Sequence, residues 1–185
     1  MMNGNWVKYQ NGNYTVNINL DTGTKIREND LDFFDADFPE SMDIKITNRC
    51  NMNCPMCHED SKCDGAHGDI MSESFIDRLH PYTELAIGGG NALEHPDFYN
   101  FLIKCKNLKL ICNTTVRQEH FMQNLDFIRK LRDKGLIYGL GISLSDPWQD
   151  GFIGAVKEFP NAVIHVINGI VTMQDIEQLR YYGLK

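Results

Sequence analysis

The chain has 185 residues, of which 42% are hydrophobic and 23% charged, and its formal net charge is −7. Domains usually run to about 100–200 residues, so this length and composition predict one main globular domain and exclude a disordered polyelectrolyte. The acidic balance argues against a general nucleic-acid binder, so we expect no nucleic-acid partner. No apolar run approaches the roughly 20 residues of a membrane span, so we expect no membrane association. No signal peptide is visible, so we expect a cytoplasmic location.

The first 40 residues predict a small β-meander that leads into an acidic linker. Apolar and polar residues alternate with a period of two over residues 14–20, which is typical of a half-buried strand. Glycine-containing turns flank this segment on both sides and indicate hairpins. We expect strands over residues 6–9, 14–20 and 24–27, a linker over residues 28–40, and a separate N-terminal unit over residues 1–40.

From residue 42 onward, strand-like and helix-like segments alternate along the chain. Strands are expected over residues 42–47, 83–88, 108–113, 138–144 and 162–167, and helices over residues 72–80, 96–106, 121–131, 151–159 and 172–183. Repeated strand–helix units of about 30 residues build a parallel sheet with helices outside it. The sequence therefore predicts an α/β fold over residues 41–185: a partial (βα) barrel of about five parallel strands. The expected sixth strand is missing before residue 185, which leaves an open sheet edge.

Four of the six cysteines lie within 14 residues, directly after the first strand of this predicted barrel. Three of them, Cys50, Cys54 and Cys57, form a C-x3-C-x2-C run. A cysteine group in a reducing compartment indicates a metal or cofactor site more than disulfides. A [4Fe–4S] cluster held by three thiolates has one iron that is open to an external ligand.

This arrangement resembles the radical S-adenosylmethionine (radical SAM) superfamily, whose motif is C-x3-C-x2-C after the first strand of a partial (βα) barrel. The resemblance covers about residues 42–185. It implies a [4Fe–4S] cluster on Cys50, Cys54 and Cys57, with S-adenosylmethionine chelated by the open iron. It also implies reductive cleavage of that cofactor to a 5′-deoxyadenosyl radical, which abstracts a hydrogen from a substrate, and an external one-electron donor of the flavodoxin or ferredoxin type.

The same resemblance assigns contacts with S-adenosylmethionine. Glycines after the second strand match the Gly-Gly-Glu-Pro motif of the family, except that Asn91 stands where Glu is usual. An Asn carbonyl still accepts a hydrogen bond from an ammonium group, but without the charge. The full set of implied contacts is Met56, Gly88, Gly89, Gly90, Asn91, Asn113, Ser143 and Ile167.

Structural zinc is the main alternative for the cysteines. Cys63 could close a four-thiolate site with the other three, and His58 or His67 are further candidate ligands. A non-catalytic iron–sulfur or zinc-binding module that keeps the fold is therefore the second hypothesis.

The sequence assigns no catalytic residue and no particular substrate. An open sheet edge suits a protein or peptide substrate, or a dimer mate that covers the edge. His165 lies in the middle of the fifth strand, where its side chain either faces the barrel interior and touches substrate or packs outward.

Overall fold

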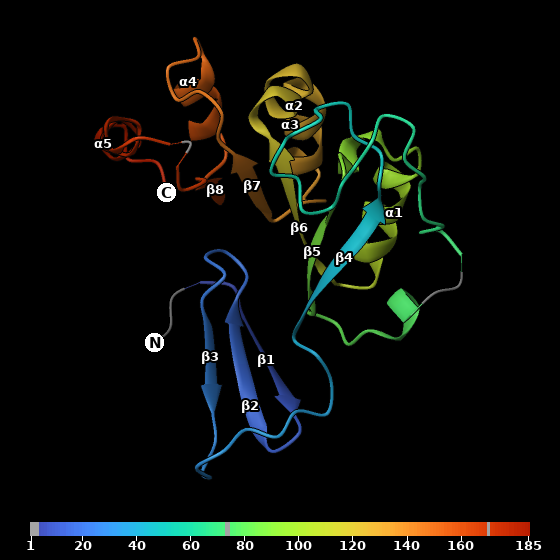
Figure 1. Ribbon diagram of the computed structural model, residues 1–185. Helices are drawn as coiled ribbons and strands as arrows, with labels where there is room; N and C mark the ends of the chain where they lie inside the picture. The colour runs from blue at the N-terminus through green and yellow to red at the C-terminus, as the bar shows by residue number, and fades with distance from the viewer. Residues whose placement is uncertain (1–3, 73–74, 170) are drawn as a thin grey trace. The chain divides into compact units, whose positions relative to one another are not determined.

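The computed structural model describes residues 4–72, 75–169 and 171–185. The chain divides into two compact units, Met1–Glu40 and Ser41–Lys185 (Figure 1). The first unit is an antiparallel sheet in which the strands follow one another in the order β1-β2-β3. Its strands are β1 (Trp6–Asn11), β2 (Tyr14–Asn19) and β3 (Lys25–Glu28), so the meander expected from the sequence is present.

The acidic segment after β3 is fastened to this sheet by two buried polar side chains. Asn11 donates to the carbonyl oxygen of Phe38 and accepts from the backbone N–H groups of Asp37 and Phe38. The carboxylate of Glu40 accepts two hydrogen bonds from the guanidinium of Arg27, at 2.9 and 3.0 Å, and one from the hydroxyl of Tyr14 at 2.7 Å. These bonds hold the end of the linker, at residues 37–38 and at Glu40, against the strands.

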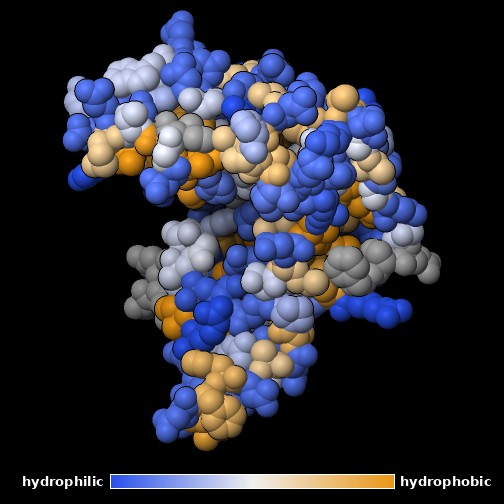
Figure 2. Space-filling view, viewed as in Figure 1, coloured by the Kyte–Doolittle hydropathy of each residue, from blue (hydrophilic) through white to orange (hydrophobic). Residues whose placement is uncertain are grey.

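Apolar side chains remain at the surface of the same unit. Figure 2 shows apolar surface at the end of the unit toward which β3 points. Among the described residues of this unit, the exposed large apolar side chains are those of Ile26, Leu31, Phe33 and Phe34.

The second unit is built on a five-stranded parallel sheet in the order β4-β5-β6-β7-β8 (Figure 1). The strands are β4 (Ser41–Thr47), β5 (Glu84–Gly89), β6 (Ile111–Arg117), β7 (Gly139–Ser143) and β8 (Ala162–His165). The helices are η1 (Phe75–Arg78), η2 (Ala92–Glu94), α1 (Phe98–Asn107), α2 (Gln118–Gln123), α3 (Leu125–Asp133), α4 (Phe152–Lys157) and α5 (Met173–Tyr181). This is the α/β partial-barrel arrangement expected from the sequence.

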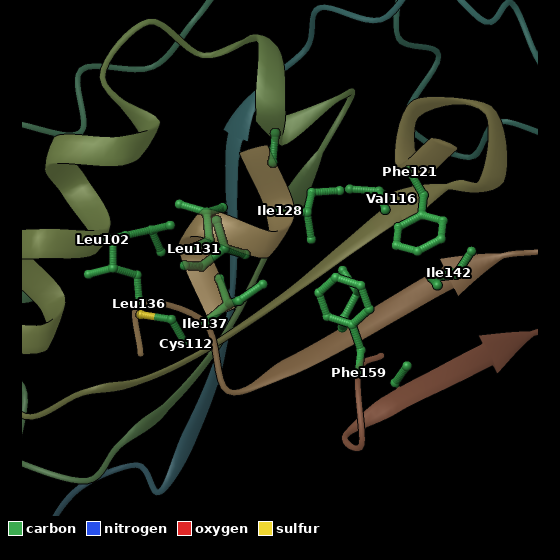
Figure 3. Packing of buried hydrophobic residues seen from close by; sticks show 14 of the residues in the cluster. Leu102, Cys112, Val116, Phe121, Ile128, Leu131, Leu136, Ile137, Ile142 and Phe159 are labelled. Atoms are coloured by element: carbon green, nitrogen blue, oxygen red, sulfur yellow. The ribbon is translucent and has the colours of Figure 1, made fainter. Parts of the chain in front are cut away.

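The core lies between one face of this sheet and the helices. Alternate residues of each strand point to this face, as the strand period of two requires. Figure 3 shows Val116 and Ile142 from the sheet packed beside Phe121 of α2 and Ile128 of α3. Phe121 also meets Phe159 edge-on, with ring centroids 5.7 Å apart. Among the described residues, no helix covers the other face of the sheet, and that face borders a cavity.

Several expected boundaries are wrong. The strand expected over residues 108–113 runs over Ile111–Arg117, because the chain first completes a turn at Lys109 with a φ of 59° and the β-branched residues at 114–116 then extend the strand. The helix expected over residues 72–80 is only the short helix η1, and residues 73–74 lie outside the described residues. The helix expected over residues 121–131 is two helices that meet at Asn124.

The outer edge of β8 is not entirely bare, contrary to the expectation of an open edge. The backbone N–H of Ile164 donates to the carbonyl oxygen of Lys185 at 2.7 Å. α5 begins with the expected capping box between Thr172 and Asp175, and Gly183 with a φ of 71° follows it. The segment after α5 therefore returns to β8, where a further strand would pair.

Across the described residues, every helix is too short or too polar to cross a bilayer.

Replacing Glu40 with Gln should weaken the N-terminal unit at neutral pH but not in acid. Burial acts to raise the pKa of Glu40, but hydrogen bonds from Arg27 and Tyr14 outweigh it and hold the pKa below its ordinary value of 4.5. This stabilisation is complete above the ordinary pKa and is lost as the pH falls through the lowered pKa of the folded state. Amide exchange rates of β2 between pH 3 and 7 measure it, and Asp32→Asn, an exposed carboxylate of the same unit, is the control. Equal exchange in the Glu40→Gln chain and the original at pH 7 would contradict the role of Glu40.

Candidate functional site

A cavity of about 570 Å³ opens on the helix-free face of the parallel sheet, toward the carboxyl ends of the strands. All five strands or the segments after them contribute to its wall. Most of the residues that the sequence assigned to a cofactor line it together: Cys50, Cys54, Met56, Cys57, Gly88, Gly89, Gly90, Ser143 and Ile167. The structure therefore brings the cysteine run, the glycine run and the ends of β7 and β8 to one place.

The cysteine loop starts where the end of β5 closely approaches the end of β4. The N–H of Gly90 donates to the carbonyl oxygen of Thr47 at 2.8 Å, and the N–H of Asn91 donates to that of Arg49 at 2.7 Å. Gly89 has a φ of +121°, and a Cβ at Gly89 or Gly90 would overlap a carbonyl oxygen of the β4 end. Only glycine permits this approach. The glycine run therefore has a structural role of its own: it fixes the backbone at Arg49, one residue before Cys50.

The far end of the cysteine loop is tied to the same segment. The N–H of Cys50 donates to the carbonyl oxygen of Lys62 at 2.9 Å, and the N–H of Lys62 donates back to that of Asn48 at 3.1 Å. The N–H of Asn48 donates to Ala66 at 2.8 Å. Residues 50–62 thus form a closed excursion that leaves and rejoins the end of β4.

Two side chains from the junction of β6 and α2 hold the middle of this excursion. Arg117 donates from Nη1 to the sulfur of Cys54 at 2.8 Å, and its Nε donates to Glu119 at 2.7 Å. The Nε2 of His120 lies 2.8 Å from Oδ1 of Asn51. Arg117 was not expected in the site, because the strand expected from the sequence ended at residue 113. The alternation of buried and cavity-facing residues through Arg117 is the signal that identifies it.

Local electrostatics differ among these groups. Burial raises the pKa of the Cys50 thiol, and the nearby carboxylate of Glu94 adds to this effect. The hydrogen bond to Glu119 raises the pKa of Arg117, so the guanidinium beside Cys54 stays charged. Burial lowers the pKa of His120, which therefore contacts the loop as a neutral ring near pH 7. At the rim, Lys45 forms an ion pair with Glu59 between β4 and the loop.

Two of the assigned residues do not line the cavity. Asn91 is buried and its Oδ1 accepts from the N–H of Leu93, so its side chain caps η2, while its Nδ2 donates to Glu94 at 3.1 Å. Asn113 was expected at the end of a strand but lies in the middle of β6, where its Cα pairs with Ala86 and Gly139. It shares the face of β6 with cavity residues Thr115 and Arg117, nearer the amino end of the strand.

Of the additional candidate metal ligands, His58 lines the cavity with the three cysteines, whereas Cys63 and His67 do not. Cys63 is exposed and does not line the cavity, and His67 lies 2.9 Å from the hydroxyl of Thr47. Within residues 4–72, 75–169 and 171–185, no three His, Cys, Asp or Glu side chains converge so as to hold one metal ion. Cys105 and Cys112 are buried in the core, as expected.

Comparisons with known proteins find only low sequence identities. No family model matches the chain. The chain is 24% identical over 100 residues to a protein of Methanocaldococcus jannaschii named 7,8-dihydro-6-hydroxymethylpterin dimethyltransferase; the match covers 50% of this chain and 20% of that protein. Among solved structures it is similar to Streptococcus suis SuiB, with a TM-score of 0.57 and 14% identity over 96% of this chain and 58% of that one. The latter similarity supports the fold. The chain spans about a fifth of the curated relative and less than two thirds of SuiB.

Gly90→Ala and Gly88→Ala form a matched pair that tests the anchor of the cysteine loop. A methyl group at Gly90 overlaps the carbonyl of Arg49, whereas a Cβ at Gly88 meets nothing within 4 Å. We expect Gly90→Ala to lower the free energy of unfolding by about 1–3 kcal/mol, as overpacking does. Gly88→Ala should leave it unchanged or raise it by about 0.4–1 kcal/mol, because alanine restricts the unfolded chain. Urea unfolding measures both, and equal effects would contradict the close-approach argument.

Proposed function

We propose that this chain is a radical SAM enzyme that binds a [4Fe–4S] cluster through Cys50, Cys54 and Cys57, with S-adenosylmethionine beside it. The observation that carries the proposal is that all three thiols of the C-x3-C-x2-C run line one cavity, immediately after the first strand of a parallel sheet. Parallel α/β folds build their sites at this end of the strands. Thiolates are the ligands of iron–sulfur clusters.

When bound, the cluster would supply the electron that cleaves S-adenosylmethionine to methionine and a 5′-deoxyadenosyl radical, which takes a hydrogen atom from the substrate. The residues of the chain position this chemistry. Backbone bonds from Gly90 and Asn91 hold the start of the cysteine loop, and Arg117 holds Cys54. The cavity residues that we assign to S-adenosylmethionine are Met56, Gly88, Gly89, Gly90, Ser143 and Ile167.

A carboxylate stands three residues after Asn91, at Glu94, beside the position where the family motif has its Glu. Asn91 donates to Oε1 of Glu94, and Nε of Arg49 lies 3.3 Å from its Oε2. Glu94 does not itself line the cavity, but Arg49, Asn91 and the cavity residue Cys50 are its neighbours; beside the larger effect of burial, its carboxylate adds to the rise in the pKa of Cys50. We propose that Glu94, three residues after Asn91, provides the negative charge for the ammonium group of the cofactor.

The donor geometry favours a cluster over structural zinc. A zinc ion needs four ligands within about 2.3 Å of one point. A cluster with an open iron needs only the three thiols of the run, all of which line the cavity. Cys63, the fourth thiol of a four-thiolate zinc site, is exposed and does not line the cavity, which favours the cluster over that zinc site.

The curated relative is named for methyl transfer to a pterin, a reaction class for which S-adenosylmethionine is a suitable methyl donor. This name supports the use of S-adenosylmethionine. We further propose that a flavodoxin- or ferredoxin-type protein supplies the electron. A protein or peptide substrate, or a dimer mate at the outer edge of β8, is the alternative to a small-molecule substrate.

Cys54→Ala should abolish iron binding, whereas Cys63→Ala should leave it unchanged. The first variant removes a proposed cluster ligand that Arg117 holds in place, and the second removes an exposed thiol outside the cavity. Iron and zinc content after anaerobic reconstitution with iron and sulfide measures the difference. Bound zinc that is lost in both variants would instead identify a four-thiolate zinc site.

In the original chain, the reduced cluster should give an EPR signal that changes when S-adenosylmethionine is added. The change arises because the cofactor binds the iron that has no cysteine ligand. A cluster signal that is indifferent to S-adenosylmethionine would refute the proposed enzyme and favour a non-catalytic iron–sulfur module.

A further inference from the structure

The helix-free face of the parallel sheet has a floor of very small side chains at its centre. Thr115 of β6 pairs with Gly141 of β7, and Gly88 of β5 lies in the same row, one residue after the pair Ile87 and Thr114. Neighbouring strands are about 4.8 Å apart, so this row extends about 10 Å from β5 to β7 with no side chain larger than threonine. Toward the amino ends of the strands, Ala86 and Gly139 are also small, but Asn113 of β6 lies between them and bounds the floor: its Oδ1 lies 2.5 Å from the place where a Cβ of Gly139 would stand.

Polar side chains stand over one border of this floor. A Cβ at Gly141 would lie 2.5 Å from the hydroxyl oxygen of Thr115, 2.7 Å from Cε1 of His165 and 3.1 Å from its Nε2. The absence of a side chain at Gly141 therefore lets both groups lean over β7. The ring of His165 faces the barrel interior, which resolves the two orientations that the sequence left open.

Three polar side chains near this border are available to hydrogen-bond a ligand. Thr115, Ser143 and His165 all line the cavity, and Ser143 pairs with His165 across β7 and β8. In the part of the chain that the structure describes, none of these three side chains has a hydrogen-bond partner. A hydroxyl both donates and accepts hydrogen bonds, and an imidazole offers two ring nitrogens, so these groups suit a ligand whose edge carries hydrogen-bonding groups.

We propose that this floor binds the substrate, and that the substrate carries a flat, fused heterocyclic ring with hydrogen-bonding groups on its edge. The ring lies over Thr115 and against Gly141 of β7, where a larger side chain would hold it away from the sheet, and its far edge meets the cofactor at Gly88, which the proposed function assigns to S-adenosylmethionine. Thr115 and His165 contact its edge, and Val163 adds an exposed apolar side chain in the same row as Gly141. The proposal deepens the proposed function, because it names the substrate class of that same cavity.

The position of the floor relative to the cysteine loop agrees with a substrate site. Arg117, Ser143 and His165 form one row across three strands, and Arg117 at one end of the row contacts Cys54. His165 therefore lies two strand spacings, about 10 Å, from the residue that holds the cysteine loop. A cofactor beside the loop and a ring on the floor occupy neighbouring parts of the cavity.

Binding of lumazine and hypoxanthine, two flat fused heterocycles, tests the proposal in the reconstituted chain saturated with S-adenosylmethionine. Calorimetry or lumazine fluorescence should detect binding of at least one of them. Inositol, a saturated ring with polar groups, should not bind. Thr115→Val and His165→Phe should each weaken binding about 3- to 10-fold, which corresponds to the loss of one hydrogen bond.

Thr114→Val is the matched control. Thr114 lies on the opposite face of β6, where its hydroxyl donates to the carbonyl oxygen of Ile87 at 3.0 Å. The control should leave the affinity for the ring unchanged. Binding of neither heterocycle, equal binding of inositol, or a loss in Thr114→Val equal to that in Thr115→Val would overturn the proposal.

Two outcomes separate this inference from the proposed function. If S-adenosylmethionine displaces the heterocycle competitively, the floor belongs to the cofactor and the substrate assignment fails while the proposed enzyme stands. If the heterocycle binds with the expected variant effects but the EPR signal does not respond to S-adenosylmethionine, the ring site stands and the proposed enzyme fails.

Discussion

The close approach between the end of β5 and the end of β4 is the constraint on which the candidate site depends. Gly89 and Gly90 bring their backbone against Thr47 and Arg49, and the resulting hydrogen bonds fix the chain directly before Cys50. Because the return segment at Lys62 bonds to Cys50 and Asn48, the loop between them has both ends fastened to one strand. A loop whose two ends are already held together loses less conformational entropy on binding a ligand than a loop with free ends does.

The period of two along the strands explains how one sheet supplies both a core and a cavity. Leu85, Cys112 and Ile142 point toward the helices and are buried, while their neighbours in sequence point to the other face. On that second face, Gly88, Thr115 and Gly141 form a central row of small residues. Larger side chains, such as Asn113, Arg117 and His165, stand around this row and leave the space above it open. The cavity is thus a consequence of residue size on one face, and apolar packing on the opposite face keeps the strands in place.

The sequence was sufficient to predict the order of strands and helices and the convergence of Cys50, Cys54 and Cys57 with the glycine run, because both follow from periodicity and from position after a strand. It did not predict contacts between segments distant in the chain. The bond from Arg117 to Cys54 spans 63 residues and depends on β6 extending four residues beyond the expected end. Asn91 was assigned from its place in a motif, but its side chain satisfies the first turn of η2, a local demand that competes with any ligand contact.

Arg117, Ser143 and His165 form a row that runs from the cysteine loop to the border of the floor. Arg117 is charged and fully engaged by Glu119 and Cys54, so its position is fixed by bonds on both sides. Ser143 and His165 follow it on the next two strands, and the backbone ladder fixes their spacing from it. Any movement of the cysteine loop is therefore resisted by the same strands that carry the floor. Under the proposed function, this connection through the sheet would set the distance between the thiols and a bound ring, and a fixed distance is what hydrogen transfer between a cofactor and a substrate requires.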